Sequence, residues 1–198
     1  MPSRYSFPTA FDFNRAREMV TLIDAAYAQL DQFDQAAPWA PPAGYALIAT
    51  LSAKEIWKAP SPLSDLLSHL LKPVPFGFVA TKDSAVYVVI RGTRTPLEWF
   101  DDFSAQPVPF QPSGTPWGKT TRGFATLYGD PGMGPTINNA LSTLGPRGLG
   151  QVFVTGHSLG AALAHLAAAG IRAQFDAVTP VSYTFCGPRA GGPDFAAA

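Results

Sequence analysis

Hydrophobic residues recur at helical spacing near the start of the chain. Asp12 precedes this stretch and is the residue type that accepts hydrogen bonds from the first backbone N–H groups of a helix. A repeat of three or four residues places the apolar side chains on one helix face. The pattern predicts an amphipathic helix from Phe13 to about Asp31, packed on the core through Met19, Val20, Ile23, Ala26, Tyr27 and Leu30.

The pattern then changes to strands. "YALIATLSA" (residues 45–53) follows a proline-rich stretch and predicts a strand, and "SPLSDLLSHLLKP" (residues 61–73) predicts a short helix that ends before its last proline. "FGFVAT" and "AVYVVIRGT" flank Lys82-Asp83-Ser84, which predicts a hairpin. The second strand is rich in Val and Ile, so we expect it to be buried on both faces.

A strand–helix–strand unit follows in the second half of the chain. "QVFVTG" (residues 151–156) leads into a long helix of Ala and Leu, and "VSYTFCG" (residues 181–187) comes after it. Such a unit places its two strands parallel in one sheet. The predicted fold class is therefore α/β, with a mainly parallel sheet and flanking helices.

One serine lies at the junction of this strand and helix. In a nucleophile elbow, serine occupies a strained turn, and glycines two positions away on each side avoid clashes. Gly156-His157-Ser158-Leu159-Gly160 satisfies this requirement. Two readings remain open for Ser158, a catalytic nucleophile or the ordinary N-cap of a strand-to-helix turn.

Composition narrows the class of protein. The chain has 198 residues and is 46% hydrophobic, which predicts one domain spanning residues 1–198. Lys and Arg equal Asp and Glu at 14 each, so nucleic acid is not an expected partner. The chain contains no apolar leader segment and no run of about 18 apolar residues, which predicts a soluble protein without a transmembrane segment.

Cysteine and histidine usage predicts neither disulfide nor metal. Cys186 is the single cysteine, and we expect it to be buried and structural. The three histidines are dispersed and have no metal-ligand spacing. We therefore expect no metal and no cofactor.

Four blocks resemble the class 3, fungal-type lipases of the α/β-hydrolase superfamily. They are "VYVVIRGTRTPLEWFDDF", "TTRGFATLY", "VTGHSLGAALAHLAA" and "YTFCGPRAGGPDFA", in the order of that family. The resemblance implies an α/β-hydrolase fold with a nucleophile elbow and a short lid helix. It also implies a serine carboxylester hydrolase, most simply a triacylglycerol lipase, with a short-chain or feruloyl esterase as an alternative. Thr121 and Cys186 depart from the family's usual His and Gly.

The resemblance implies an oxyanion hole as well. Its donors are the backbone N–H groups of Leu159 and Thr93, and the Thr93 hydroxyl is a further candidate donor. In the family, an Asp nine residues after this position holds the hydroxyl-bearing side chain, and Asp102 matches it here. The alternative for Asp102 is a surface carboxylate in a helix.

A short helix is expected directly after the oxyanion position. Thr95-Pro96-Leu97-Glu98 is a capping box with proline at the first helical position. The apolar side chains that follow predict a mobile lid for a substrate at a lipid–water interface, and the alternative is a small helix packed on the core. The lid residues are Leu97, Trp99, Phe100 and Phe103.

The rest of a catalytic triad is not evident. In the family, the triad Asp and His follow the last block, so both are expected beyond Ala198 and the chain is expected to be incomplete at its C-terminus. His157 should point away from Ser158, His165 lies along the next helix, and nothing constrains His69. Asp176 and Asp194 are expected at a helix end and in a loop.

A competing hypothesis is a non-catalytic relative that binds lipid or another partner and lacks a full triad. The oligomeric state and the compartment stay open. Secretion is the family expectation, the cytoplasm is the alternative, and the chain shows no signal peptide.

Overall fold

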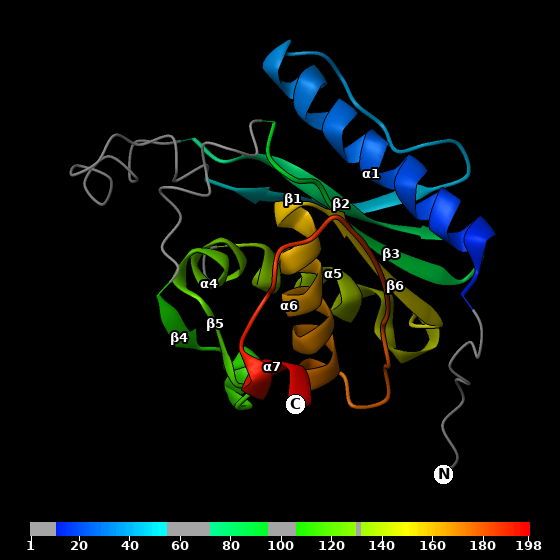
Figure 1. Cartoon of the computed structure of the whole chain (residues 1–198). Helices are drawn as coiled ribbons and strands as arrows, with labels where there is room; N and C mark the ends of the chain where they lie inside the picture. Colours follow the sequence, from blue (N-terminus) through cyan, green and yellow to red (C-terminus); the bar gives the residue numbers. More distant parts are fainter. Residues whose placement is uncertain (1–10, 55–71, 95–105, 130–131) are drawn as a thin grey trace.

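A computed structural model describes residues 11–54, 72–94, 106–129 and 132–198 of the chain. Its centre is a five-stranded sheet in the order β1-β2-β3-β6-β7 (Figure 1). β2 runs antiparallel to both of its neighbours, β1 and β3, whereas β3, β6 and β7 run parallel. The strands are β1 (Ala46–Ala53), β2 (Val74–Lys82), β3 (Ala85–Ile90), β6 (Gln151–His157) and β7 (Val181–Phe185).

The expected hairpin joins β2 and β3. Lys82 pairs with Ala85, and the two residues between them adopt left-handed backbone angles, with φ of 48° at Asp83 and 64° at Ser84. Two such residues in succession are typical of the tight turns that match the twist of an antiparallel pair. All residues of β3 are buried, as its Val- and Ile-rich sequence predicts.

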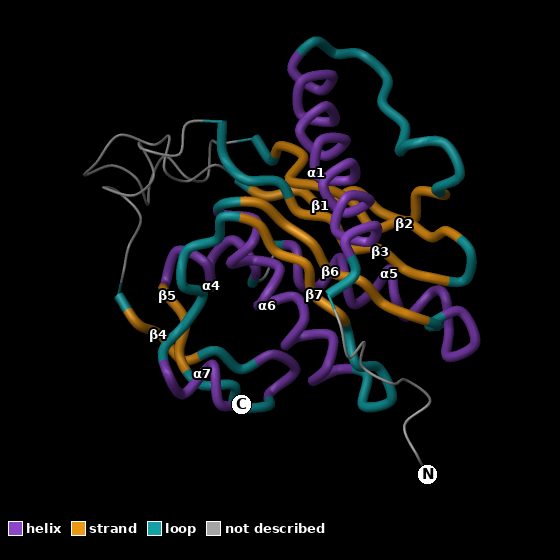
Figure 2. The backbone as a smooth tube through the Cα atoms, turned by 45° about the vertical axis from the view of Figure 1, so that its right-hand side comes forward, coloured by secondary structure: helices purple, strands orange, loops and turns teal. Residues whose placement is uncertain are grey.

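Helices cover both faces of the sheet. α1 (Phe13–Asp34) lies across one face, and α5 (Met133–Gly148) and α6 (Leu159–Gln174) lie on the other (Figures 1 and 2). Each face has its own buried hydrophobic cluster. The strand–helix–strand unit β6-α6-β7 is present, and its two strands are parallel as expected.

The sequence pattern predicts α1 well. Asp12 caps it by accepting hydrogen bonds from the backbone N–H groups of Asn14 at 2.9 Å and Arg15 at 3.1 Å. The buried face carries Met19, Ile23, Ala26 and Leu30 from the predicted set, and also Leu22. The prediction for Val20 is wrong, because its side chain is 41% exposed. Leu22 and Ile23 turn the apolar stripe away from Val20.

A smaller unit packs below the main sheet. It contains a two-stranded sheet that the sequence analysis does not predict, since its short strands carry two prolines. Gly191 forms an isolated bridge to this sheet through Thr120. The unit consists of β4 (Pro107–Pro109), the 3-10 helix η2 (Pro112–Gly114), β5 (Lys119–Thr121), α4 (Arg122–Tyr128) and α7 (Pro193–Ala197).

Two residues near the C-terminus differ from expectation. Asp194 lies in the first turn of α7 and not in a loop, because Pro193 begins a helix there. Cys186 is exposed and not buried. It follows the last residue of β7 with a φ of 52°, so it belongs to a turn outside the strand.

Several predictions fall outside the described residues. These are the helix expected at residues 61–72 with His69, the capping box, Asp102 and the lid residues Leu97, Trp99, Phe100 and Phe103. Within the described part of the chain, no helix is long and apolar enough to cross a membrane.

Candidate active site

Ser158 occupies a strained turn between β6 and α6. Its backbone angles are φ 54° and ψ −124°, which a non-glycine residue rarely adopts. The side chain of Ser158 makes no capping hydrogen bond, although it stands at the N-cap position of α6. Among the described residues, the ordinary N-cap reading of Ser158 therefore has no support.

The two glycines around Ser158 are required by close backbone contacts. A Cβ atom at Gly156 would lie 2.1 Å from the carbonyl oxygen of Gly160. A Cβ atom at Gly160 would lie 2.3 Å from the carbonyl oxygen of Ile90 and 2.4 Å from that of Arg91. The sharp turn thus folds onto itself and onto the end of β3, which explains the glycine spacing seen in the sequence.

The segment Arg91-Gly92-Thr93, named here the oxyanion loop, follows β3 and lies against Ser158. A Cβ atom at Gly92 would lie 3.0 Å from the Ser158 Cβ and 2.8 Å from the His157 carbonyl oxygen. Only a residue without a side chain fits between the loop and the turn. Of the candidate oxyanion donors, Leu159 is the first residue of α6, where a backbone N–H has no acceptor within the helix.

Arg91 anchors the oxyanion loop from inside the protein. Its side chain is fully buried and stacks over the Phe76 ring, with the guanidinium carbon 4.2 Å from the ring centre. Nε donates to the Pro75 carbonyl at 2.8 Å, and Nη1 donates to the Gly92 carbonyl at 2.6 Å. The Gly92 C=O and the Thr93 N–H share one planar trans peptide and point in opposite directions. Arg91 therefore directs the Thr93 N–H away from its own guanidinium.

Thr93 is buried and keeps an unused hydroxyl. Its side chain is 4% exposed, and within the described residues Oγ1 has no hydrogen-bond partner. A buried hydroxyl without a partner is costly unless another group uses it. Asp102, the partner that the family resemblance implies, lies outside the described residues, so its role stays a prediction.

Tyr27 of α1 also contacts the oxyanion loop, and the sequence analysis identified it only as an apolar position. Its hydroxyl accepts a hydrogen bond from the Gly92 backbone N–H at 3.0 Å and lies 2.9 Å from Nδ1 of His157. The sequence contained no local signal for this role, because Gly92 and His157 are distant along the chain.

The side chains of the described histidines, His157 and His165, form hydrogen bonds with residues other than Ser158. His157 faces Tyr27, in agreement with its expected direction away from the serine. His165 lies on α6 with Nε2 3.5 Å from Oγ1 of Thr184, and partial burial of its ring lowers its pKa. Asp176 lies just after α6, where its carbonyl oxygen accepts a hydrogen bond from Arg172.

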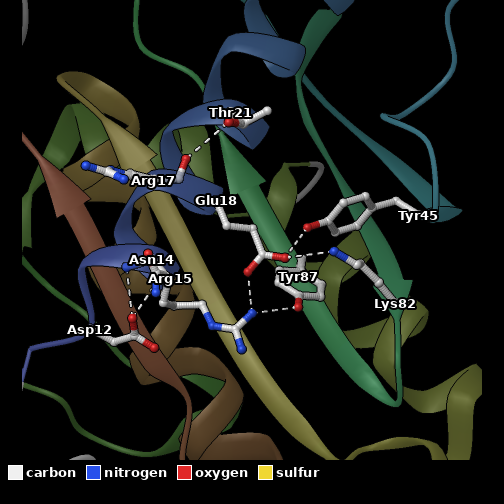
Figure 3. A network of polar contacts seen from close by, with 9 residues as sticks. All are labelled: Asp12, Asn14, Arg15, Arg17, Glu18, Thr21, Tyr45, Lys82 and Tyr87. Atoms are coloured by element: carbon white, nitrogen blue, oxygen red, sulfur yellow. Dashed lines mark hydrogen bonds and ion pairs between the residues drawn. The ribbon is translucent and has the colours of Figure 1, made fainter.

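A second polar cluster, named here the Glu18 network, lies at the amino end of β3 (Figure 3). The Glu18 carboxylate accepts hydrogen bonds from Arg15, Tyr45 and Lys82. Burial opposes ionisation of Glu18, but the hydrogen bonds from Tyr45 and Lys82 and the nearby charge of Arg15 hold its pKa below the usual value. All polar groups at its centre have partners from this chain, so the network serves as a structural tie between α1 and the sheet.

Neither of two surface hollows is lined by Ser158 or Thr93. One, beside the Glu18 network, includes Asn14 and Asp83, and the other lies between β5 and α7 and includes Lys119 and Arg189. Among the described residues, no group of three or more His, Cys, Asp or Glu side chains is placed to hold a metal ion.

Comparison with known proteins identifies relatives of this arrangement. The profile of the family described as Lipase (class 3) matches residues 87–198. A lipase from Rhizomucor miehei is 34% identical to this chain over 124 residues, which are 60% of this chain and 33% of the relative. The chain thus spans about a third of the length of that curated relative.

Solved structures of lipases share the fold. The triacylglyceride lipase of Rhizomucor miehei has a TM-score of 0.66 at 24% identity, over 95% of this chain and 68% of that one. A lipase from Rhizopus microsporus var. chinensis has a TM-score of 0.67 at 20% identity, and the match covers 99% of this chain and 66% of that lipase. A triacylglycerol lipase whose catalytic centre is formed by a serine protease triad has a TM-score of 0.66 at 24% identity. That match covers 96% of this chain and 67% of the lipase. The expected α/β-hydrolase fold is confirmed.

Proposed function

Because this chain belongs to the class 3 lipase family, we propose that it carries the nucleophile and the oxyanion hole of a serine carboxylester hydrolase. One observation supports this most directly. Ser158 has strained backbone angles and an uncapped hydroxyl at the N-terminus of α6, with the oxyanion loop packed against it. This is the arrangement that exposes a serine hydroxyl to an ester carbonyl.

In the proposed reaction, Oγ of Ser158 attacks the ester carbonyl and forms a tetrahedral intermediate. The backbone N–H groups of Leu159 and Thr93 donate hydrogen bonds to its oxyanion, and the positive end of α6 adds to this stabilisation. Collapse of the intermediate releases the alcohol and leaves an acyl-enzyme, which water then hydrolyses. The base and its carboxylate partner are not assigned to any described residue.

The proposed substrate is a lipid ester, most simply a triacylglycerol at a lipid–water interface. The named relatives are lipases, and one is titled a triacylglyceride lipase. The apolar lid residues, Leu97, Trp99, Phe100 and Phe103, fit such a substrate and stay a prediction from the sequence. Secretion, which the family resemblance implies, stays a prediction too.

The test uses the full-length protein with p-nitrophenyl butyrate and a fluorophosphonate probe. Ser158→Ala should abolish both labelling and hydrolysis, because the acyl-enzyme needs this oxygen. Ser142→Ala is the matched control, since Ser142 is exposed on α5. Labelling that persists in Ser158→Ala would contradict the assignment. A wild-type protein that neither labels nor hydrolyses the ester would favour a non-catalytic, lipid- or partner-binding relative.

A further inference from the structure

We infer that Tyr27 is a positioning residue that holds the oxyanion loop and the nucleophile turn in register. It lies on α1, which packs on the opposite face of the sheet from α6 (Figure 1), and among the described residues its hydrogen bonds are with Gly92 and His157 and not with Ser158. Its hydroxyl meets both segments through Gly92 and His157. The inference rests on the proposed roles of Ser158 and Thr93.

The atoms fix the direction of one hydrogen bond of Tyr27, the one from Gly92, and we assign the direction of the other. The Gly92 N–H donates to the phenol oxygen at 3.0 Å, so the phenol proton is free to donate to Nδ1 of His157 at 2.9 Å. Burial raises the pKa of Tyr27, which keeps this proton in place. In this arrangement Nδ1 of His157 accepts, and the ring proton lies on Nε2. One hydroxyl thus joins the residue before Thr93 to the residue before Ser158.

The fit between Tyr27 and Gly92 is close. A Cβ atom at Gly92 would lie 2.6 Å from the Tyr27 hydroxyl oxygen, so the phenol reaches the backbone of the loop itself. Phenylalanine would fill the same space but would leave the Gly92 N–H and the His157 Nδ1 without a partner. Both groups would then seek other partners, and the loop would shift relative to Ser158.

The same face of α1 also binds Arg94, the residue that follows Thr93. Asp31 and Asp34 follow Tyr27 by four and seven residues, which is one stripe along a helix. Arg94 forms ion pairs with both carboxylates, and its Nη1 lies 2.7 Å from Oδ2 of Asp34. The residues on either side of Thr93 are therefore both tied to α1. Together with the bond from Arg91 to the Gly92 carbonyl, these contacts fix the Thr93 N–H in place.

The experiment compares Tyr27→Phe with Tyr87→Phe in the full-length protein. Tyr87 is the matched control, because it loses a hydroxyl contact to Arg15 of 3.0 Å at the other end of the same helix–sheet interface. We expect Tyr27→Phe to lower kcat for p-nitrophenyl butyrate about 10- to 100-fold, with KM changed less than about 2-fold, because a displaced donor weakens the transition state and not the ground state. Tyr87→Phe should leave both parameters unchanged.

A second measurement reads the hydrogen bond directly. Long-range ¹H–¹⁵N spectra of the histidine rings should show His157 with its proton on Nε2 in the wild type and a mixture of both neutral forms in Tyr27→Phe. His157→Leu should lower kcat to the same degree as Tyr27→Phe, and the double variant should lose no more than either one.

Three outcomes would overturn the inference. They are an unchanged kcat in Tyr27→Phe, an equal loss in Tyr27→Phe and Tyr87→Phe, and a His157 ring spectrum that is the same in the wild type and in Tyr27→Phe. If the wild type shows no ester hydrolysis, the proposed function fails, and the His157 ring spectra of the wild type and of Tyr27→Phe still decide whether Tyr27 bridges the two segments.

Discussion

The two ends of β3 are held by different kinds of interaction. At the amino end, side chains bind side chains in the Glu18 network, where Arg15, Lys82 and Tyr45 surround one carboxylate (Figure 3). At the carboxyl end, side chains bind backbone. Arg91 holds the carbonyls of Pro75 and Gly92, and Tyr27 accepts the Gly92 N–H.

This difference predicts how each end responds to mutation. Side-chain networks near the surface adjust to a lost partner, because each member keeps rotamer freedom and access to water. Backbone groups that are hydrogen-bonded to buried side chains, or packed closely against glycines, have no such freedom, because packed interiors do not deform easily. A proposed oxyanion donor is a backbone N–H and needs the second kind of support. We therefore expect substitutions at the carboxyl end of β3 to lower the free energy of unfolding more than substitutions at its amino end.

The largest expected effect is that of Gly160→Ala. The new Cβ would lie 2.3 Å from the Ile90 carbonyl oxygen and 2.4 Å from that of Arg91, and both belong to backbone. We expect unfolding free energy to fall by about 3 kcal/mol or more, because overpacking of this kind has no flexible neighbour to absorb it. Urea denaturation measures the change. Gly114→Ala shows the cost of backbone strain without a clash, since no atom lies within 4 Å of its Cβ position but its φ of 77° is unfavourable for alanine. Equal stability of wild type and Gly160→Ala would refute the close contact.

Arg91→Met should have the next largest effect. The substitution removes the donors to the Pro75 and Gly92 carbonyls, and both carbonyl groups stay buried without these hydrogen bonds. We expect the free energy of unfolding to fall by about 2–3 kcal/mol. The substitution should also lower kcat, because the Gly92–Thr93 peptide loses its anchor. Arg15→Met is the counterpart at the amino end and should cost less than about 1 kcal/mol. Equal losses of unfolding free energy in Arg91→Met and Arg15→Met would contradict the proposed difference between the two ends of β3.

Glu18→Gln tests the amino end through pH. The pKa of Glu18 is lowered in the folded protein, so its ionised form adds stability at any pH above the usual value of 4.5. That contribution is lost as pH falls through the lower folded value. We expect Glu18→Gln to reduce unfolding free energy at pH 7 by about 1 kcal/mol, because the site is partly exposed. Urea titrations at several pH values should converge below pH 4.5. A constant difference at every pH would show that packing, and not charge, is responsible.

Asp34→Asn should have the smallest effect on stability. Its ion pair with Arg94 is about half exposed, with 46% relative exposure on each side chain, so we expect a loss of no more than about 0.5 kcal/mol. Salt should screen most of this contribution. Thermal unfolding at low and high ionic strength measures it. A larger loss that salt does not change would mean that Asp34 acts by packing.

Local patterns predicted the elements whose signals lie within one segment. Asp12 and the apolar stripe predicted α1, and the glycines around Ser158 predicted the turn between β6 and α6. The α/β class followed from the order of such segments, and the α/β-hydrolase fold followed from the family resemblance. The misses have physical reasons, since exposure of Val20 depends on how the helix rotates on the sheet and exposure of Cys186 depends on its turn.

The site was less predictable than the fold. The oxyanion loop was expected from the family resemblance, but its anchors were not. Arg91 binds a carbonyl of the neighbouring strand β2, and Tyr27 binds two segments remote from it in sequence. Contacts of this type depend on the packing of several elements together, so no periodicity or motif within one segment carries them. The roles of Ser158, Leu159, Thr93 and Asp102 stay predictions.

The contacts of Tyr27 also bear on the order of folding. They join residues separated by 65 and 130 positions, whereas the hairpin of β2 and β3 closes through a turn of two residues. Bringing distant segments together costs loop-closure entropy that local contacts do not. The oxyanion loop should therefore reach its final place only after α1 has docked on a sheet that is already formed. By the same reasoning, a brief undocking of α1 in the native protein would disable the proposed ester hydrolysis while the sheet stays folded.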